Sequence, residues 1–171
     1  MKQEQRFFFC PMCGHKLSYE NDGEKMRLTC PGCGYVLYEN PAVGVAAVLL
    51  DGYNRILLGR RNRGRRKGLW CIPCGFVDYE EDIYSAVVRE LKEETGLDIA
   101  VNKVFNVYTN FVPDKNTVGI WFLAEQKGGD LKAGDDLDKV DFFNLDSLPS
   151  MAFDNDIKII QELKMRIEDK E

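Results

Sequence analysis

Three glutamates and an arginine lie within six residues of one another, in the segment RELKEE at positions 89–94. A helix turns by about 100° per residue, so Glu94 lies about 40° to one side of Glu90 and Glu93 about 60° to the other. Like charges gathered on one helix face repel one another. A hard divalent cation such as Mg²⁺ or Mn²⁺, which prefers carboxylate oxygens, would offset that repulsion. The competing interpretation is a solvated charged helix face.

A second group of residues able to do chemistry is formed by four cysteines near the N-terminus. They form two C-x2-C pairs, separated by sixteen residues, at Cys10, Cys13, Cys30 and Cys33. Each pair can form a tight turn, and two such turns supply the four thiolates of a tetrahedral zinc site. Gly14 and Gly34 follow the pairs and allow the backbone to turn. Two disulfides, or four unrelated thiols, are the alternatives to zinc.

Composition and charge limit the class of protein. The chain has 171 residues, 44% of them hydrophobic and 30% charged, which is typical of a soluble globular protein. A net charge of −5 argues against nonspecific nucleic-acid binding by the whole chain. The sequence shows no signal-peptide pattern and no apolar run long enough to span a bilayer. We therefore expect a cytoplasmic protein without a membrane partner, whose six cysteines are reduced.

The elements expected around these groups alternate between strands and helices. Gly96 ends the glutamate-rich helix with a C-cap signal, and Asp154 is a possible N-cap of a C-terminal amphipathic helix. DGYN, at positions 51–54, predicts a hairpin that joins the first two strands of the main domain. The expected strands are 43–50, 55–59, the LWCIP segment, 99–109, 117–126 and 139–144, and the expected helices are 81–95 and 155–169.

Two domains are expected. Residues 1–38 contain too few apolar side chains to fold without an additional cross-link. A bound zinc ion would supply it, and we expect this domain to be a zinc ribbon. We expect this ribbon to be structural, to help the chain dimerise or to cap the active site, and a nucleic-acid contact is the alternative. Residues 39–171 mix strands and helices, so the main domain is an α+β fold built in layers.

The helix and the turn before it match a longer pattern, G-x5-E-x7-R-E-U-x-E-E-x-G-U, where U is aliphatic. The matching residues are Gly75, Glu81, Arg89, Glu90, Leu91, Glu93, Glu94, Gly96 and Leu97. A chance match at every position is on the order of one in a million for a chain of this length. On this pattern the chain resembles the Nudix hydrolase family, from about Ala42 to Leu163. That family includes members with an N-terminal zinc ribbon, such as NADH pyrophosphatases.

The resemblance implies an α/β/α sandwich around a mixed sheet, and a hydrolase that cuts the pyrophosphate bond of a nucleoside diphosphate derivative. It implies that Glu90, Glu93 and Glu94 bind Mg²⁺ or Mn²⁺, and Glu93 is our choice for the base that deprotonates the attacking water. It also implies that Arg89, with Glu81 as its partner, ties the loop to the helix. Family members often dimerise, so we expect a homodimer.

Four residues outside the helix are candidates for substrate binding. Six positive charges lie between Arg60 and Lys67, among which Arg60 and Arg61 are the expected phosphate contacts, unless the loop is merely solvated. Asp136 lies where family members often place a further acidic residue near the metals. Pro113 is similar to a marker of ADP-ribose pyrophosphatases, although VPDKN is also an ordinary turn.

The best substrate prediction is ADP-ribose, cut to AMP and ribose 5-phosphate. FAD, NADH and dinucleoside polyphosphates are alternatives, although the SQPWPFP-type motif of NADH pyrophosphatases is absent. Further alternatives are damaged nucleoside triphosphates, and a non-catalytic Nudix protein that senses nucleotides or binds nucleic acid. One departure from the family pattern is Cys74, where many members have glycine. With Cys71 it forms a third C-x2-C pair, which is interpreted as two packed or partly exposed thiols, with a metal or redox role as the alternative.

Overall fold

The computed structural model describes residues 6–111 and 116–169. The chain divides into two compact units, Met1–Asn40 and Pro41–Glu171. Each unit has a hydrophobic core of its own. No helix within the described ranges is long and apolar enough to cross a membrane.

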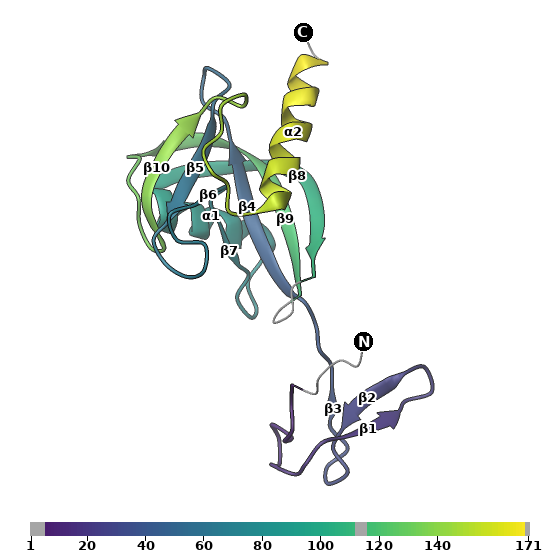
Figure 1. Cartoon of the computed structure of the whole chain (residues 1–171). Coiled ribbons are helices and arrows are strands. Elements are labelled where there is room, and N and C mark those ends of the chain that lie inside the picture. Colours follow the sequence, from purple (N-terminus) through teal and green to yellow (C-terminus); the bar gives the residue numbers. More distant parts are fainter. Residues whose placement is uncertain (1–5, 112–115, 170–171) are drawn as a thin grey trace. The chain divides into compact units, whose positions relative to one another are not determined.

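The first unit is a small antiparallel sheet next to two cysteine turns (Figure 1). Its strands pair in the order β1-β2-β3, with bounds β1 Ser18–Asn21, β2 Met26–Thr29 and β3 Val36–Leu37. The two turns repeat one geometry. In each, the amide after the second cysteine, that of Gly14 or Gly34, donates to the carbonyl of the first cysteine at 2.9 Å. Both glycines have φ near +75°, which a residue with a side chain rarely adopts.

The second unit contains two sheets. The larger has the order β7-β4-β9-β8, and its central pair β4–β9 is parallel while the outer pairs are antiparallel. The smaller sheet has the order β10-β5-β6 and is antiparallel. The bounds are β4 Ala42–Leu49, β5 Ile56–Arg61, β6 Trp70–Cys71, β7 Cys74–Phe76, β8 Leu97–Asn110, β9 Thr117–Gly129 and β10 Leu137–Phe143.

Two helices, α1 (Ile83–Thr95) and α2 (Asp154–Glu168), cover opposite faces of the strands (Figure 1). Side chains alternate along a strand, so successive residues of β4 enter different cores. One set packs with α1 and consists of Val45, Ala47 and Leu49. The other packs with α2 and consists of Ala46 and Val48. The predicted α/β/α sandwich with a mixed sheet is confirmed.

The predicted hairpin between the first two strands of the main domain is wrong as a sheet pairing. The turn exists, and Leu50 forms an isolated bridge with Ile56. Both edges of β4 are already occupied, however, by β7 and β9, so β5 pairs with β10 and β6 in the other sheet. The LWCIP segment is likewise divided, because Trp70–Cys71 joins one sheet and Cys74–Phe76 the other.

The sequence marked two helix ends, of which one is confirmed and one is wrong. Helix α1 ends at Gly96 in the left-handed conformation, as predicted, and begins after Asp82, whose side chain accepts from two helix amides. Asp154 is not the N-cap of α2. It is the first helical residue, because Phe153 takes the extended cap conformation, without a side-chain hydrogen bond.

Candidate active site

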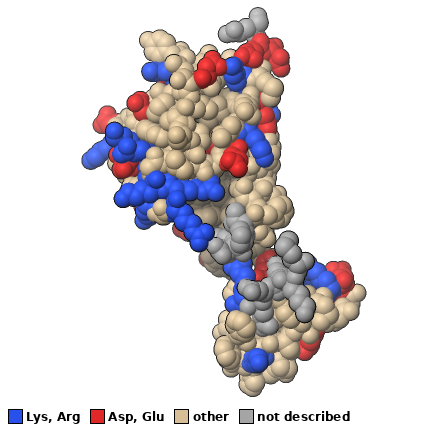
Figure 2. Space-filling view, viewed as in Figure 1, with Lys and Arg blue, Asp and Glu red and all other residues tan. Residues whose placement is uncertain are grey.

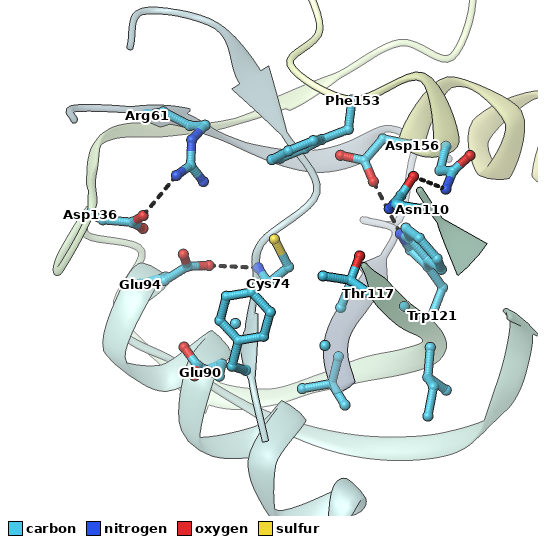
Figure 3. A pocket seen from close by; sticks show the side chains of 18 of the residues that line it. Arg61, Cys74, Glu90, Glu94, Asn110, Thr117, Trp121, Asp136, Phe153 and Asp156 are labelled. Carbon is cyan, nitrogen blue, oxygen red and sulfur yellow. Dashed lines mark hydrogen bonds and ion pairs between the residues drawn. The ribbon is translucent and has the colours of Figure 1, made fainter. Parts of the chain in front are cut away.

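A cavity of about 800 Å³ opens in the second unit, where β4, β7, β9, helix α1 and the start of α2 meet (Figure 3). Its two ends differ in chemistry. One end carries charged groups: Arg61, Arg63, Glu90, Glu94, Asp135 and Asp136. The other end carries amide groups, an indole and one buried carboxyl: Asn110, Trp121, Asn155 and Asp156. Phe153 lies between the two ends, with the guanidinium groups of Arg61 and Arg66 over its ring.

Glu90 reaches this cavity across a glycine. Its carboxylate lies against the backbone of Gly75 in β7, where an added Cβ would fall 1.9 Å from the Glu90 carboxyl carbon. No side chain fits at that position. The first glycine of the motif is therefore required by the close approach of Glu90, whereas its φ is not positive.

Glu94 is the most buried member of the acidic group, with 1% of its surface exposed. Its Oε2 accepts from the backbone amide of Cys74 at 2.8 Å, and its carboxyl faces that of Asp136 (Figure 3). Burial, and then the neighbouring Asp136, raise the pKa of Glu94 to about 10. Burial also raises the pKa of Glu90. The fold therefore gathers carboxyl groups where negative charge is costly.

Arg89 lies at the centre of the charged residues next to the cavity. Its guanidinium donates to both oxygens of Glu81, at 2.7 and 2.8 Å, and to the Phe76 carbonyl at 3.2 Å. It also contacts Glu90 at 2.9 Å and Glu93 at 3.2 Å. The Arg89 guanidinium lowers the pKa of Glu81 to about 2. These contacts join the loop after β7 to helix α1.

Glu93 occupies a different environment from the other two glutamates. Its side chain is 49% exposed and is not among the residues that line the cavity. Glu90, by contrast, has 13% of its side chain exposed and lines the cavity with Glu94. The shared helix face predicted from the sequence thus runs from a buried residue to a solvent-exposed one.

The two arginines expected to contact phosphate point in different directions. Arg61 lines the cavity and pairs with Asp136 at 3.2 Å, whereas Arg60 pairs with Asp138 at 2.7 Å and is not among the lining residues. Because they are neighbours on β5, their side chains leave opposite faces of the strand. Figure 2 shows lysines and arginines gathered on the left of the second unit, where Figure 1 draws β5 and β10. Arg63 and Arg66, which the sequence did not single out, also line the cavity.

Sequence reasoning missed the carboxyl and amide groups at the other end of the cavity. Asp156, at the start of α2, is 2% exposed and accepts from the Ile72 amide at 3.0 Å and the Trp121 indole at 3.1 Å. Burial raises its pKa to about 7, and the two donors partly oppose that rise. Asn110 and Asn155 are hydrogen-bonded to one another at 2.7 Å. The only signal in the sequence was the polar run at 154–156.

In the stretch 111–113, only Pro113 was singled out from the sequence. Phe111 is 81% exposed and is among the residues that line the cavity. Pro113, the expected ADP-ribose marker, lies outside the described residues.

Cys74 does not disturb the backbone where many family members have glycine. It lies in β7, paired with Ala46 of β4, and is not among the residues of positive φ. Its amide instead supplies the hydrogen bond to Glu94. A side chain at this position is therefore compatible with the loop.

The four N-terminal cysteines form one cluster in the first unit. All four sulfur atoms lie within 4.8 Å of one another, with Sγ–Sγ distances of 3.4 Å for Cys13–Cys30 and 3.7 Å for Cys10–Cys33. A tetrahedron with Zn–S bonds of about 2.3 Å has edges of about 3.8 Å. The cluster thus fits a single tetrahedral metal ion, and none of its members is in a disulfide.

Comparison with known families matches both units. The NUDIX domain model covers residues 40–163, and the model described as Nudix N-terminal covers residues 9–39. Among solved structures, a NUDIX hydrolase from Nitrosomonas europaea is 26% identical and has a TM-score of 0.80, over 91% of this chain and 89% of that one.

Two curated relatives carry more specific names. The ADP-ribose pyrophosphatase of Methanocaldococcus jannaschii is 42% identical over 132 residues, which are 75% of this chain and 76% of the relative. The NAD-capped RNA hydrolase NudC of Vibrio atlanticus is 31% identical over 89% of this chain, but the match spans only 54% of that protein. The chain therefore belongs to the Nudix hydrolase family, as a pyrophosphohydrolase with an N-terminal Nudix ribbon.

Proposed function

We propose that this enzyme hydrolyses ADP-ribose to AMP and ribose 5-phosphate. The observation that carries the proposal is the cavity with two chemically different ends. Its acidic and basic end suits a metal-bound pyrophosphate, and its aromatic and amide end suits an uncharged nucleoside or sugar. The volume of about 800 Å³ lies within the range of small-molecule sites. The relative named ADP-ribose pyrophosphatase, 42% identical, supports the choice.

Glu90, Glu93, Glu94 and Asp136 are proposed to hold the divalent cation, Mg²⁺ or Mn²⁺. The donor set fits a hard cation because it consists of carboxylates, and burial raises the pKa of Glu90 and Glu94. A cation there would screen the phosphate charge and lower the pKa of a coordinated water. Because thiols are poor ligands for Mg²⁺, Cys74 is proposed to contribute only its amide.

The remaining roles follow from the contacts. Arg89 and Glu81 position the loop after β7, and thereby Gly75 beside Glu90. Arg61 is proposed to contact a phosphate, since its guanidinium reaches the cavity. Arg60, bound to Asp138, is a weaker candidate. Glu93, exposed at the edge of the acidic group, is proposed as the base that takes the proton of the attacking water.

The cysteine cluster is proposed to hold a structural Zn²⁺. Four thiolates leave no open coordination position for a substrate, as in other closed zinc sites. Among the described residues of this unit, the buried core consists of Cys10, Leu17, Leu28 and Cys30, so the metal would stabilise the fold.

A product assay tests the proposed reaction. Purified protein with Mg²⁺ receives ADP-ribose, NADH, FAD, a dinucleoside polyphosphate or a nucleoside triphosphate mixture, and chromatography identifies the products. We expect AMP to form fastest from ADP-ribose. Release of pyrophosphate from triphosphates, or no turnover of any compound, would contradict the proposal.

The Glu93→Gln variant tests the proposed base. Loss of a general base lowers kcat by about 10²-fold or more, while the melting temperature should change little because Glu93 is half exposed. Glu125→Gln is the matched control, since Glu125 is also exposed and paired with a cation. Activity of Glu93→Gln equal to that of Glu125→Gln would remove Glu93 from this role.

A second candidate substrate is NAD-capped RNA. The NudC relatives and the arginines beside the cavity, Arg63 and Arg66, favour it. Phosphate contacts along an RNA would make the affinity fall steeply with salt. Adding a short NAD-capped RNA to the assay, at low and high salt, separates this activity from hydrolysis of free nucleotides.

A further inference from the structure

We infer that Asp156 and Asn110 bind the neighbouring hydroxyl groups of a ribose that is attached to the pyrophosphate of the substrate. Both residues line the cavity, at the end away from Glu90 and Glu94 (Figure 3). The inference rests on the proposed function for the identity of the substrate, but the binding of the ribose can be tested without turnover.

The Asp156 carboxyl is held in place by two donors. The Trp121 indole donates to its Oδ1 at 3.1 Å, and the Ile72 backbone amide donates to its Oδ2 at 3.0 Å. Neither donor can accept a hydrogen bond, so both carboxyl oxygens serve as acceptors. Each oxygen of a carboxylate can accept a second hydrogen bond. Because Asp156 lines the cavity, a molecule bound there can use these remaining positions.

A chain of side-chain hydrogen bonds fixes the orientation of the Asn110 amide. The Lys158 ammonium donates to Asn155 Oδ1 at 3.3 Å, and Asn155 Nδ2 donates to Asn110 Oδ1 at 2.7 Å. An ammonium group can only donate, so it determines which atom of the Asn155 amide is the oxygen. That choice in turn leaves the Asn110 Nδ2 atom pointing away from Asn155.

This Nδ2 atom is an unused donor. It has no hydrogen-bond partner among the residues that the structure describes, whereas every buried side-chain nitrogen and oxygen of those residues has one. The Nδ2 atom of Asn110 is therefore accessible, in a residue that lines the cavity. The far end of the cavity thus presents a carboxylate acceptor and an amide donor.

The neighbouring hydroxyls of a ribose match this pair of groups. One hydroxyl can donate to the Asp156 carboxylate, while the oxygen of the other accepts from the Asn110 amide. Carboxylates bind ribose hydroxyls in the same way in dinucleotide sites. A phosphate is a poor alternative occupant, because the carboxylate would repel its negative charge.

The distance from the acidic group favours a ribose over a base. The Cys74 amide donates to Glu94 at 2.8 Å, and two residues earlier the Ile72 amide donates to Asp156 at 3.0 Å. Two residues span at most about 7 Å, so the accepting oxygens of Glu94 and Asp156 lie no more than about 13 Å apart. In a nucleotide the ribose is joined directly to the phosphate, and the base lies beyond it.

ADP-ribose contains two such riboses, one on each side of the pyrophosphate, and both carry neighbouring hydroxyls. The experiment therefore uses analogues that differ on one side only. In all of them a methylene group replaces the oxygen between the two phosphorus atoms, so that this bond cannot be cut. One analogue keeps both riboses, one has 2,3-dideoxyribose on the adenine side, and one has it at the terminal position.

Calorimetry measures the binding of each analogue to the full zinc-loaded chain in Mg²⁺. We expect one of the two dideoxy analogues to bind at least tenfold more weakly than the parent, because it loses hydrogen bonds to a charged group and an amide. The analogue that is weakened identifies which ribose occupies the site. A fourth analogue, with hypoxanthine in place of adenine, reports on recognition of the base.

Two variants assign the preference to this site. Asn110→Ala and Asp156→Asn should each reduce the preference for the ribose at least threefold, and leave the preference for adenine over hypoxanthine unchanged. Asn102→Ala is the matched control, because Asn102 lies on the same strand and donates to Glu125 at 3.0 Å, but does not line the cavity. If Asp156→Asn does not fold, the half-buried Asn110 decides the outcome.

Equal binding of the parent and both dideoxy analogues overturns the inference, as does an undiminished ribose preference in Asn110→Ala. A variant that changes the adenine preference instead would show that the pair contacts the base. Absence of any binding by the parent also contradicts the inference. If the protein binds the parent analogue but does not cut ADP-ribose, the proposed function fails, while the ribose preference still decides the role of Asp156 and Asn110.

Discussion

The two units of this chain are stabilised in different ways. In the first, Met1–Asn40, the core found among residues 6–40 has four buried members, two of which are cysteines of the metal cluster. The second, Pro41–Glu171, has strands whose two faces pack into separate cores, one with each helix. A small unit can be held by shared ligands to one ion, whereas the larger one is held by burial of apolar surface.

The difference decides where a polar site can be buried. All the buried polar or charged residues of the described chain, Glu94, Thr95, Asn155 and Asp156, belong to the second unit. Two of them are carboxyl groups whose pKa is raised by burial. Burying such groups destabilises a fold, and only a core of this size can offset that cost.

Among changes that separate the two units, removal of the predicted zinc is expected to have the largest effect on stability. A strong zinc chelator should unfold the first unit completely, because its thin core cannot replace the metal. Amide hydrogen exchange checks this: β2 should exchange as in an unfolded chain, while β4 stays protected. Cys30→Ser should reproduce the effect, and Cys71→Ser, outside the cluster, should retain zinc. Loss of protection in β4 would show that the units are not independent.

A core truncation should act on the second unit alone. Leu91 of α1 is 1% exposed in the core shared with β4. Leu91→Ala should therefore lower the free energy of unfolding of this unit by about 2–5 kcal/mol. Chemical denaturation, followed by tryptophan fluorescence, measures the change, since Trp70 and Trp121 both lie in this unit. Zinc affinity should be unchanged, and a parallel fall in zinc affinity would contradict the separation.

A smaller and pH-dependent effect is expected from Asp156. Its pKa is raised from 3.8 to about 7, so between these values the folded protein holds a proton that the unfolded chain has released. Stability from this group is thus greatest at low pH and falls as pH rises through that window. The asparagine of Asp156→Asn cannot ionise. This variant should therefore reduce the fall in stability between pH 5 and pH 8 by about 2 kcal/mol.

Melting temperatures between pH 5 and pH 8 check this expectation in chelated, metal-free protein. The exposed Asp146→Asn is the matched control, since Asp146 has 74% of its side chain in solvent. The same slope in Asp156→Asn and Asp146→Asn would show that Asp156 is not the source.

Much of the site could be predicted from short segments of the sequence. The C-x2-C spacing predicted the cysteine cluster, and the RELKEE segment predicted the acidic helix together with its Gly96 cap. These features depend on residues a few positions apart, whose geometry is fixed by one turn or one helix. The α/β/α sandwich could be predicted because the RELKEE segment is part of the motif on which the chain resembles the Nudix family, and the family resemblance implies the fold.

Tertiary structure alone decided which members of each local group reach the cavity. Glu94 is buried and Glu93 exposed, and Arg61 faces the cavity while Arg60 does not, although each pair is adjacent in sequence. Asp156 meets the Trp121 indole only because α2 returns to the sheet. The placement of β4 and β5 in two different sheets could not be predicted from the sequence either. Such outcomes depend on contacts between distant segments, which determine burial and pKa but leave no periodic signal in the chain.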